Sequence, residues 1–379
     1  MSNDYKFFKE EAERIDEVKI LAANELKDPP PNYSGSFSLD YDLVTPFPEG
    51  RIIEVYGNEG SCKTTLVLEV AGRAIQNGKA VLYINMERNL TASLLKSVRT
   101  IRPFVDEALA NIDNENLNQC PLRLCWAPNG EAALETMRKF CLQFPHGIAI
   151  LDSIDAAQPE AVLSGEIGEL KVGNLGKLMS DALRKLIVAA DNNHVTLIFV
   201  NQTRQHIGGY GQMLSTPGGN AIKFYASQRI ELLKPAKDQI IVLQDKDNEN
   251  EGERIGVLIR YKIVKNKLAP DGIAGEFPIL FGHGIFREKE LIDQCLKFGV
   301  LKFGGKGGRQ VLLPSINRET KEFLTNAKGE ITTIMISRFN AARKLLLDSM
   351  LTQQLEKQLR QLTTPGKNEI IESLLKDEV

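Results

Sequence analysis

The chain lacks both a strong charge bias and a long apolar run. Its 379 residues include 47 Lys and Arg against 49 Asp and Glu, a formal net charge of −2. A nearly balanced charge is no sign of nucleic-acid binding by the whole molecule, so any basic surface has to be local. No segment reaches the ~18 consecutive apolar residues of a membrane helix, and the charged N-terminus has no apolar signal region. We therefore expect a cytoplasmic protein without a membrane partner.

Cysteine is also scarce. The five cysteines form an odd and scattered set: Cys62, Cys120, Cys125, Cys141 and Cys295. Cys120 and Cys125 lack the further ligands of a zinc site, so free thiols in a reducing compartment are expected. With 42% apolar and 25% charged residues, the composition is that of an ordinary globular protein. The length suffices for one large α/β domain plus one or two small ones.

One stretch organises the rest of the sequence: GNEGSCKTT, residues 57–65. It follows an apolar, strand-like run and opens an amphipathic segment that ends at Gly78. A strand, a glycine-bearing loop and Lys-Thr at a helix start are the context of a P-loop, whose backbone N–H groups and helix dipole bind phosphate. Lys63 would reach the β- and γ-phosphates, and Thr64 would supply a hydroxyl to Mg²⁺. Cys62 stands where the motif has glycine.

Three later apolar segments end in polar side chains; they are residues 81–87, 147–153 and 195–202. The second contains Asp152 and matches the Walker-B pattern, in which the carboxylate holds Mg²⁺ directly or through water. Glu87 ends the first, where a carboxylate one strand from the P-loop can polarise the attacking water. A solvated strand end explains Glu87 alone equally well. Gln202 ends the third, and alternating strands and helices imply a mostly parallel sheet with ligands at the strand C-termini.

Two glycine-containing segments without periodicity follow these strands, at 163–173 and 203–219, with a helix expected between them at about 174–192. A loop of about 17 residues inside a compact domain is usually functional or mobile. The second segment carries Arg204 and His206, which would suit contacts with nucleic acid. A surface loop without a ligand accounts for it as well.

The N-terminal residues 5–27 have the spacing of an amphipathic helix, which prolines then stop. Such a helix docks either on its own core or on a neighbouring subunit. Further on, an acidic, polar segment at 236–258 is expected to be a solvated hairpin or an insertion. It runs into a strand that carries Lys265 and Lys267, whose spacing puts both amines on one face. Lysines that protect an edge strand from aggregation are the alternative explanation.

The composition becomes basic towards the C-terminus. Residues 287–344 hold twelve Lys and Arg against six Asp and Glu, with a glycine-rich basic turn at 302–310. This indicates a separate small domain with a local positive surface, which suits a phosphate backbone. A helix-rich tail is predicted at roughly 332–362, and a short amphipathic helix closes the chain.

Together these motifs resemble the bacterial RecA family of homologous-recombination ATPases. The resemblance is colinear over roughly 34–300 and includes IIEVYGNEGSCKTTLVLEV, INME, LDSIDAAQPEA, LIFVNQTRQHIG, PGGNAIKFYAS and IVKNK. It implies an α/β fold with a RecA-like P-loop ATPase core and a mostly parallel central sheet at 34–285. An N-terminal helix and linker at 1–33 would dock protomers, and 286–379 would form a small basic domain with a helical tail.

The resemblance implies a DNA-dependent ATPase that forms a filament on single-stranded DNA, pairs it with duplex DNA and exchanges strands. ATP and Mg²⁺ are the implied cofactors. The nucleotide site would comprise Gly57, Asn58, Glu59, Gly60, Ser61, Cys62, Lys63, Thr64, Thr65 and Asp152. Thr64 and Asp152 would hold Mg²⁺. Lys63 would be catalytic together with Glu87 as the base for water and Gln202 as the γ-phosphate sensor.

Other residues would contact a neighbouring protomer or DNA instead of the nucleotide bound by the same protomer. By the resemblance, Lys265 and Lys267 would be catalytic by reaching the ATP of the next protomer, and Phe224 would be an interface aromatic. The DNA-binding set would be Val172, Lys177, Arg184, Arg204, His206, Ile207, Gly218 and Gly219. In this set Val172 and Ile207 occupy the positions of apolar side chains that wedge between base triplets.

Several residues depart from the family pattern. Leu94 replaces a tyrosine that stacks on adenine, Thr91 replaces an aspartate that contacts the base, and His206 replaces a lysine. At Cys62, a positive φ would cost about 1–2 kcal/mol. A thiol beside phosphate at a helix N-terminus is also expected to have a lowered pKa. Such divergence indicates a remote member of the family, for instance a phage-encoded one.

Two other functions fit parts of the sequence. A RecA-like paralogue that binds DNA or a recombinase, with little ATP turnover, would explain Cys62 and the altered adenine contacts. A P-loop helicase or small-molecule kinase would explain the loop but not the INME, VNQ and IVKNK motifs. ATP hydrolysis measured with and without single-stranded DNA distinguishes these functions.

Overall fold

The computed structural model describes residues 26–110, 121–164, 174–205, 214–236, 239–244, 252–305 and 310–363. The chain divides into two compact units, residues 1–30 and 31–379, and all elements below belong to the second. The helix predicted at 5–27 lies outside the described residues up to residue 25, as does the predicted closing helix after Pro365. Within the described ranges, no helix is long and apolar enough to cross a bilayer.

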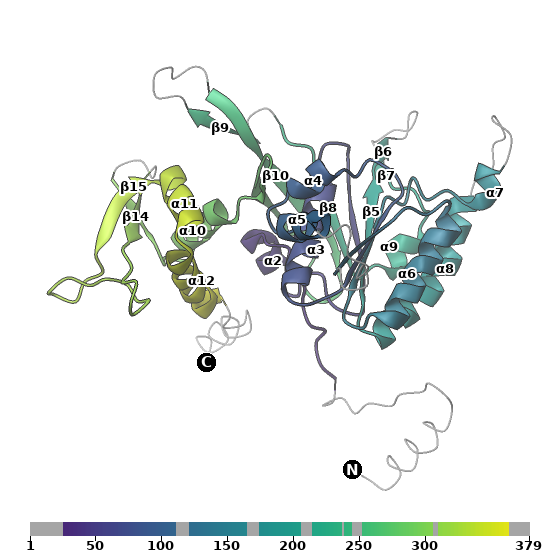
Figure 1. The fold of residues 1–379 in the computed structure, drawn as a ribbon, viewed down its shortest axis with the longest axis horizontal. Coiled ribbons are helices and arrows are strands. Elements are labelled where there is room, and N and C mark those ends of the chain that lie inside the picture. The colour runs from purple at the N-terminus through teal and green to yellow at the C-terminus, as the bar shows by residue number, and fades with distance from the viewer. Residues whose placement is uncertain are drawn as a thin grey trace, which may run out of the picture. The chain divides into compact units, whose positions relative to one another are not determined.

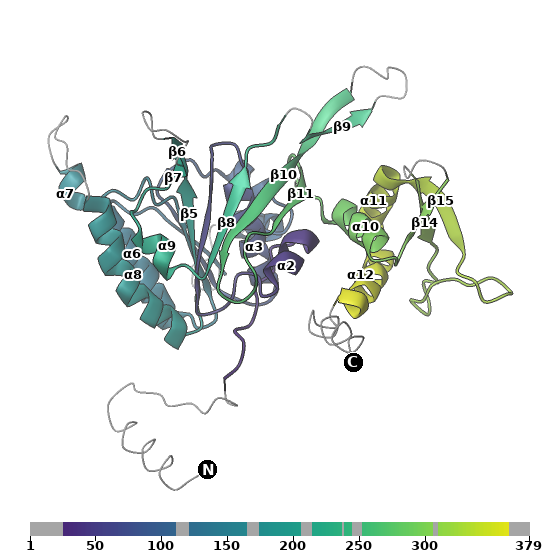
Figure 2. The same ribbon diagram turned by 180° about the vertical axis from the view of Figure 1, so that it is seen from behind.

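A ten-stranded sheet forms the centre of the second unit (Figures 1 and 2). Its strand order is β12-β11-β10-β8-β1-β5-β4-β2-β3, with β9 paired to β10. The strands are β1 Ile52–Gly57, β2 Val81–Asn85, β3 Leu122–Cys125, β4 Ile148–Asp152, β5 Thr196–Gln202, β8 Gln228–Leu233, β9 Ile240–Gln244, β10 Gly252–Asn266, β11 Ala274–Leu280 and β12 Gly284–Ile285. Six strands, from β3 to β8 in this order, run parallel, and the others pair antiparallel. The predicted α/β fold with a mostly parallel sheet is confirmed.

Helices cover both faces of this sheet. They are α2 Phe37–Leu43, α3 Lys63–Gln76, α4 Ala92–Lys96, α5 Arg102–Ala110, α6 Gly130–Gln143, α7 Glu160–Leu163, α8 Asn174–Asn192 and α9 Ala221–Tyr225. Ile53 and Val55 of β1 join the hydrophobic cluster under α3, whereas Ile52 joins the cluster under α6 and α8. Since successive side chains of a strand point to opposite faces, an apolar run without alternation is what a strand covered on both sides requires. Figure 1 shows α6, α8 and α9 grouped together, apart from α3, α4 and α5.

The prediction of α8 matches the structure at both ends, but several elements were missed. No helix was predicted over α2, and no element was predicted over α4, α5, β3 and α6. Two of these helices begin at N-cap residues that could be recognised in the sequence. Thr91 caps α4, and the Asn129 Oδ1 atom accepts a hydrogen bond from the Ala132 amide at 2.8 Å at the start of α6.

The residues from Phe286 onwards have a hydrophobic cluster of their own. It contains Phe286, Leu291, Val311, Leu345 and Leu355 among others. The elements are α10 Arg287–Lys297, β13 Lys302–Gly304, β14 Gln310–Pro314, β15 Thr333–Ser337, α11 Arg338–Leu347 and α12 Ser349–Thr363. The prediction of a helix-rich tail from about residue 332 is wrong at its start, because β15 pairs with β14 before the helices begin. The domain boundary at 285/286 stays a prediction.

Polar contacts attach α10 to the sheet domain. The Glu290 Oε1 atom accepts hydrogen bonds from the Ser36 hydroxyl and the Ser38 amide, both at 2.7 Å. Arg99 forms an ion pair with Glu288 at 2.8 Å. Because Glu288 and Glu290 are both buried, these contacts exclude water and hold α10 against the start of α2.

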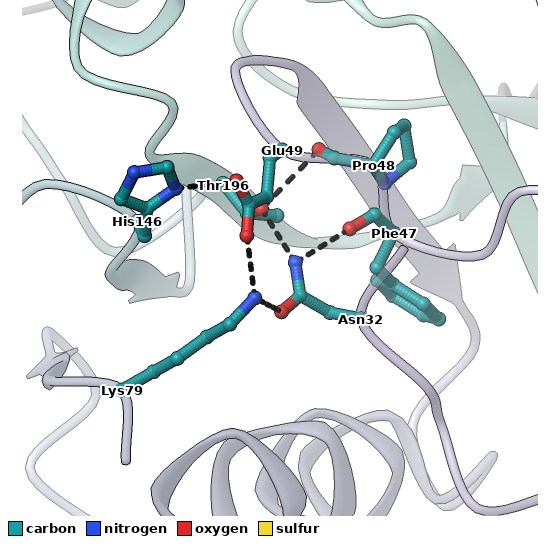
Figure 3. A network of polar contacts seen from close by, with 7 residues as sticks. All are labelled: Asn32, Phe47, Pro48, Glu49, Lys79, His146 and Thr196. Carbon is teal, nitrogen blue, oxygen red and sulfur yellow. Dashed lines mark hydrogen bonds and ion pairs between the residues drawn. The ribbon is translucent and has the colours of Figure 1, made fainter. Parts of the chain in front are cut away.

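A second polar network lies where the parallel strands begin (Figure 3). Lys79 Nζ lies 2.6 Å from both Asn32 Oδ1 and Glu49 Oε1, and His146 Nδ1 lies 2.7 Å from Glu49 Oε2. Asn32 also donates to the Thr196 hydroxyl at 2.9 Å. These residues precede or begin β1, β2, β4 and β5. The network therefore ties residue 32 to the N-terminal edge of the sheet, opposite the strand ends with the predicted site.

Candidate nucleotide-binding site

The P-loop joins the end of β1 to the start of α3. At Gly57, a Cβ atom would lie 2.1 Å from the Leu232 carbonyl oxygen of β8, so only glycine fits beside that strand. Lys63 Nζ donates to the carbonyl oxygens of Gly57 and Asn58, both at 2.9 Å, and the loop therefore curls around the ammonium group. Burial lowers the pKa of Lys63, against the raising effect of Asp152 and the other nearby acids. A desolvated cation in a loop of backbone groups suits a polyphosphate.

Cys62 occupies the N-cap position of α3 with φ 62° and ψ 29°, in the left-handed region. This explains why the motif prefers glycine there, since a Cβ atom makes that conformation costly. The side chain is half-buried and packs against the cluster under α3. The expected lowering of the pKa of Cys62 is wrong for this structure: burial raises it, and the charge of Lys63 only opposes that effect. Within the described chain, no side chain caps the first turn of α3, which leaves its amides for an anion.

The predicted Mg²⁺ ligands lie together. The Thr64 hydroxyl donates to Asp152 Oδ2 at 2.9 Å, and the Tyr83 hydroxyl donates to the same oxygen at 2.5 Å. Burial raises the pKa of Asp152, against the hydrogen bonds from Tyr83 and Thr64. A hydroxyl and one carboxylate fit Mg²⁺, which keeps several waters and takes its remaining ligands from phosphates. Sequence reasoning missed Tyr83, because nothing in an apolar strand shows which residue faces the neighbouring strand's carboxylate.

Metal sites of the zinc type are not found in the described part of the chain. It contains no group of three or more His, Cys, Asp or Glu placed to hold a metal. Its four cysteines, Cys62, Cys125, Cys141 and Cys295, are free thiols, and Cys120 lies outside it.

Glu87 and Gln202 are in direct contact. Glu87 Oε1 accepts hydrogen bonds from Gln202 Nε2 at 2.9 Å and from the Ser153 hydroxyl at 2.6 Å. Glu87 Oε2 accepts from Asn89 Nδ2 at 3.0 Å. Three donors therefore orient a carboxylate that a solvated strand end would leave free. Ser153 and Asn89 were not singled out from the sequence, although Ser153 directly follows the Walker-B aspartate.

Lys265 and Lys267 contact the C-terminal end of α9. Lys265 Nζ donates to the carbonyl oxygens of Lys223 at 2.7 Å and Phe224 at 3.1 Å, and Lys267 Nζ donates to that of Phe224 at 3.4 Å. The two amines thus lie on one side, as their spacing predicts. Phe224, whose carbonyl oxygen accepts from both amines, is 73% exposed. Both lysines therefore have hydrogen-bond partners within the protomer. Such contacts are stabilising, because a cation near a helix C-terminus interacts favourably with the unpaired carbonyl groups there.

The predicted DNA-binding residues are only partly described. Val172, His206 and Ile207 lie outside the described residues. Lys177 and Arg184 are exposed on α8. Arg204 begins the short strand β6 Arg204–Gln205, which pairs with β7 Leu214–Ser215 and so gives the segment 203–219 a two-stranded stem.

Gly218 and Gly219 follow this stem with φ of 87° and 73°. A Cβ atom on Gly218 would lie 3.0 Å from Ile154 Cγ2, and one on Gly219 would lie 3.4 Å from the Gly176 Cα atom of α8. The left-handed backbone therefore favours glycine at both positions, and at Gly218 an added Cβ would also press on the Ile154 side chain.

Thr91 has a local role. Its side chain accepts a hydrogen bond from the Leu94 amide at 3.1 Å and caps α4, while Leu94 itself is half-buried. The departure from aspartate thus preserves a helix cap, since both residue types serve in that position.

Comparison with known proteins identifies the family. A family model described as the RecA N-terminal domain matches residues 18–286. Protein RecA of Porphyromonas gingivalis is 37% identical over 293 residues, which cover 76% of this chain and 77% of that protein. Protein RecA of Nautilia profundicola is 37% identical over 276 residues, which cover 72% and 71%. Among solved structures, the RadB recombinase aligns over 67% of this chain and 98% of its own, with a TM-score of 0.46 and 18% identity. From the family match and the identity to these RecA proteins, the chain belongs to the RecA family of recombinase ATPases.

Proposed function

We propose that this chain is a DNA-dependent ATPase that forms a filament on single-stranded DNA and catalyses homologous pairing and strand exchange. One observation carries the proposal: the ends of β1, β2, β4 and β5 bring Lys63, Asp152, Glu87 and Gln202 to a single site, with Gln202 bonded to Glu87. Such a constellation is what phosphoryl transfer to water requires.

Each residue has a distinct part in this reaction. Lys63 exchanges its loop carbonyl partners for the β- and γ-phosphate oxygens, and Thr64 and Asp152 hold Mg²⁺. Held by these two residues, Mg²⁺ would supply positive charge that offsets the charge of the phosphates. Glu87, oriented by Ser153 and Asn89, accepts a hydrogen bond from the attacking water and polarises it. Gln202 contacts the γ-phosphate and so responds to whether ATP or ADP is bound. The segment that follows it, 203–219, shifts in response and alters the contacts with DNA.

The DNA and neighbour contacts complete the proposal. Lys177, Arg184 and Arg204 contact the phosphates of single-stranded DNA, and Gly218 and Gly219 add backbone donors. Val172 and Ile207 wedge between bases, and His206 adds a polar contact. In the filament, Lys265 and Lys267 leave the α9 carbonyls for the neighbour's ATP, with Phe224 at the interface. The cytoplasmic location and the phage origin stay predictions.

The alternative of a DNA-binding paralogue with little turnover is supported by Cys62 and by the altered adenine contacts at Leu94 and Thr91. The left-handed conformation of Cys62 is strained, but the loop keeps its lysine and the convergent groups around it. A protein that no longer hydrolysed ATP would have no need to keep Gln202 and Ser153 both bonded to Glu87.

Lys63→Ala tests the proposed function. We expect DNA-stimulated phosphate release to fall by about two orders of magnitude or more, because a preorganised charge at the phosphates is lost. Lys139→Ala, an exposed lysine of α6, is the control and should hydrolyse ATP normally. DNA-stimulated turnover that survived in Lys63→Ala would show that the nucleotide site is wrongly assigned. A wild-type protein that binds DNA without turnover would support the paralogue instead.

A further inference from the structure

A fully buried carboxylate lies directly behind the candidate site. Glu54, in the middle of β1, is 0% exposed. Its Oε1 atom accepts a hydrogen bond from Asn201 Nδ2 of β5 at 2.9 Å, and its Oε2 atom accepts one from Arg229 Nε of β8 at 2.6 Å. A buried charge is costly unless it is paired, and here each oxygen has its own partner on a different neighbouring strand.

Asn201 connects this carboxylate to both ends of the segment 203–217. Its Nδ2 atom also donates to the Pro217 carbonyl oxygen at 3.0 Å, where the segment returns. Its Oδ1 atom accepts from the backbone amide of Gln202 at 3.0 Å, where the segment departs. Gln202 in turn bonds to Glu87. One buried amide group thus contacts the nucleotide sensor and the far end of the predicted DNA loop.

Glu54 determines which way this amide group points. Both Glu54 Oε1 and the Pro217 carbonyl can only accept hydrogen bonds, so only the NH₂ end of Asn201 can face them. The Oδ1 end must then face the Gln202 amide. Arg229, whose guanidinium also lies 4.8 Å from the Tyr56 ring, compensates the charge of Glu54 and holds its rotamer.

We propose that Glu54 is a positioning residue that couples the nucleotide site to the DNA loop. By fixing the amide of Asn201, it makes the start of the segment at Gln202 and its end at Pro217 move as one body. A change at the Glu87–Gln202 contact then reaches both ends of the loop. This inference rests on the proposed function, because it concerns how that ATPase responds to DNA.

The neutral isostere Glu54→Gln tests the coupling. A glutamine has one acceptor and one donor end, so it must oppose its NH₂ group either to Asn201 or to Arg229. We expect the ratio of ATPase rates with and without single-stranded DNA to fall by about 10-fold, within the usual range of coupling between sites. The preference for DNA with ATP over ADP should fall similarly, while the KM for ATP and the DNA-free rate stay near wild type.

Glu49→Gln is the matched control. Glu49 is also a buried glutamate, 4% exposed, and pairs with a cation at 2.6 Å, but at the opposite edge of the sheet (Figure 3). It should lose stability without losing the DNA stimulation ratio. If Glu54→Gln behaves in the same way, Glu54 is merely structural and the coupling role is refuted.

Two further outcomes are decisive. If Glu54→Gln does not fold, Asn201→Ala takes its place, and a wild-type stimulation ratio in that variant would overturn the proposal. If the wild-type protein shows no DNA stimulation at all, the proposed function fails and the coupling role fails with it. If single-stranded DNA stimulates the wild-type ATPase and the stimulation ratio is unchanged in Glu54→Gln and Asn201→Ala, the coupling role alone is refuted and the proposed function stands.

Discussion

At the scale of a single residue, Cys62 shows how a P-loop accommodates a side chain before its lysine. The left-handed conformation of a non-glycine residue costs about 1–2 kcal/mol. Its sulfur packs against the cluster under α3, which offsets part of that cost. The same burial raises the pKa of the thiol, so the residue is a packed side chain more than a reactive one.

Two substitutions at this position should therefore differ. Cys62→Gly is expected to keep the free energy of unfolding within ~1 kcal/mol of wild type, because relief of strain offsets lost packing and added chain entropy. Cys62→Val should lower it by about 2 kcal/mol, since a β-branched side chain fits the left-handed region poorly. Urea unfolding measures both, and equal stabilities would contradict the conformation at residue 62.

At the scale of an element, two helices each contain a glycine, but only one of these glycines is required by packing. Gly72 of α3 faces Thr100, and a Cβ atom there would lie 2.5 Å from its hydroxyl oxygen and 2.7 Å from its backbone carbon. Among the described residues, a Cβ on Gly176 of α8 would have just the Gly219 Cα atom nearby, at 3.8 Å. The first glycine is needed for packing, whereas the second costs helix stability without a packing reason.

Gly-to-Ala substitutions separate these two cases. Gly72→Ala should destabilise the protein by about 1–3 kcal/mol, because the added methyl group meets backbone that has to shift. Gly176→Ala should stabilise it by ~0.5–1 kcal/mol through the better helix propensity of alanine. Thermal unfolding of the pair checks this. A stabilised Gly72→Ala would mean that α3 and Thr100 are not in close contact.

At the scale of the whole molecule, two buried glutamates attach outlying segments with opposite dependence on pH. Burial raises the pKa of Glu49, but the hydrogen bonds and charges of Lys79 and His146 outweigh this and bring it below the usual 4.5. Burial also raises the pKa of Glu290, and there the hydrogen bonds from Ser38 and Ser36 do not compensate, so it stays above 4.5.

The signs follow from linkage. The contribution of Glu49 is present above pH 4.5 and is lost as the pH falls through its folded-state pKa. The contribution of Glu290 is present below pH 4.5 and is lost as the pH rises through its folded-state pKa.

Thermal unfolding of two glutamine variants across pH tests this. Glu49→Gln should lose roughly 2 kcal/mol relative to wild type at neutral pH and nothing in acid, since it loses a charged hydrogen bond. Glu290→Gln should gain stability relative to wild type as the pH rises. Parallel pH profiles for the two variants would contradict the contrast between their sites.

Much of the fold and the chemistry of the site could be predicted from the sequence. Apolar runs located β1, β2, β4 and β5, and the helix expected at about 174–192 matches α8 at both ends. The P-loop letters and the polar residues at strand ends indicated Lys63, Thr64, Asp152, Glu87 and Gln202. These signals are local, because they depend on residues a few positions apart along the chain.

Tertiary structure alone decided which side chains meet. Tyr83 bonds to Asp152 and Glu54 to Asn201, and each pair joins different strands of the sheet. Strand order and register bring such residues together across 69 and 147 positions of sequence. Neither the strand order nor the register can be deduced from the local periodicity of the sequence. The sequence by itself thus determined the parts of the proposed ATP site, whereas the sheet decided how those parts hold one another in place.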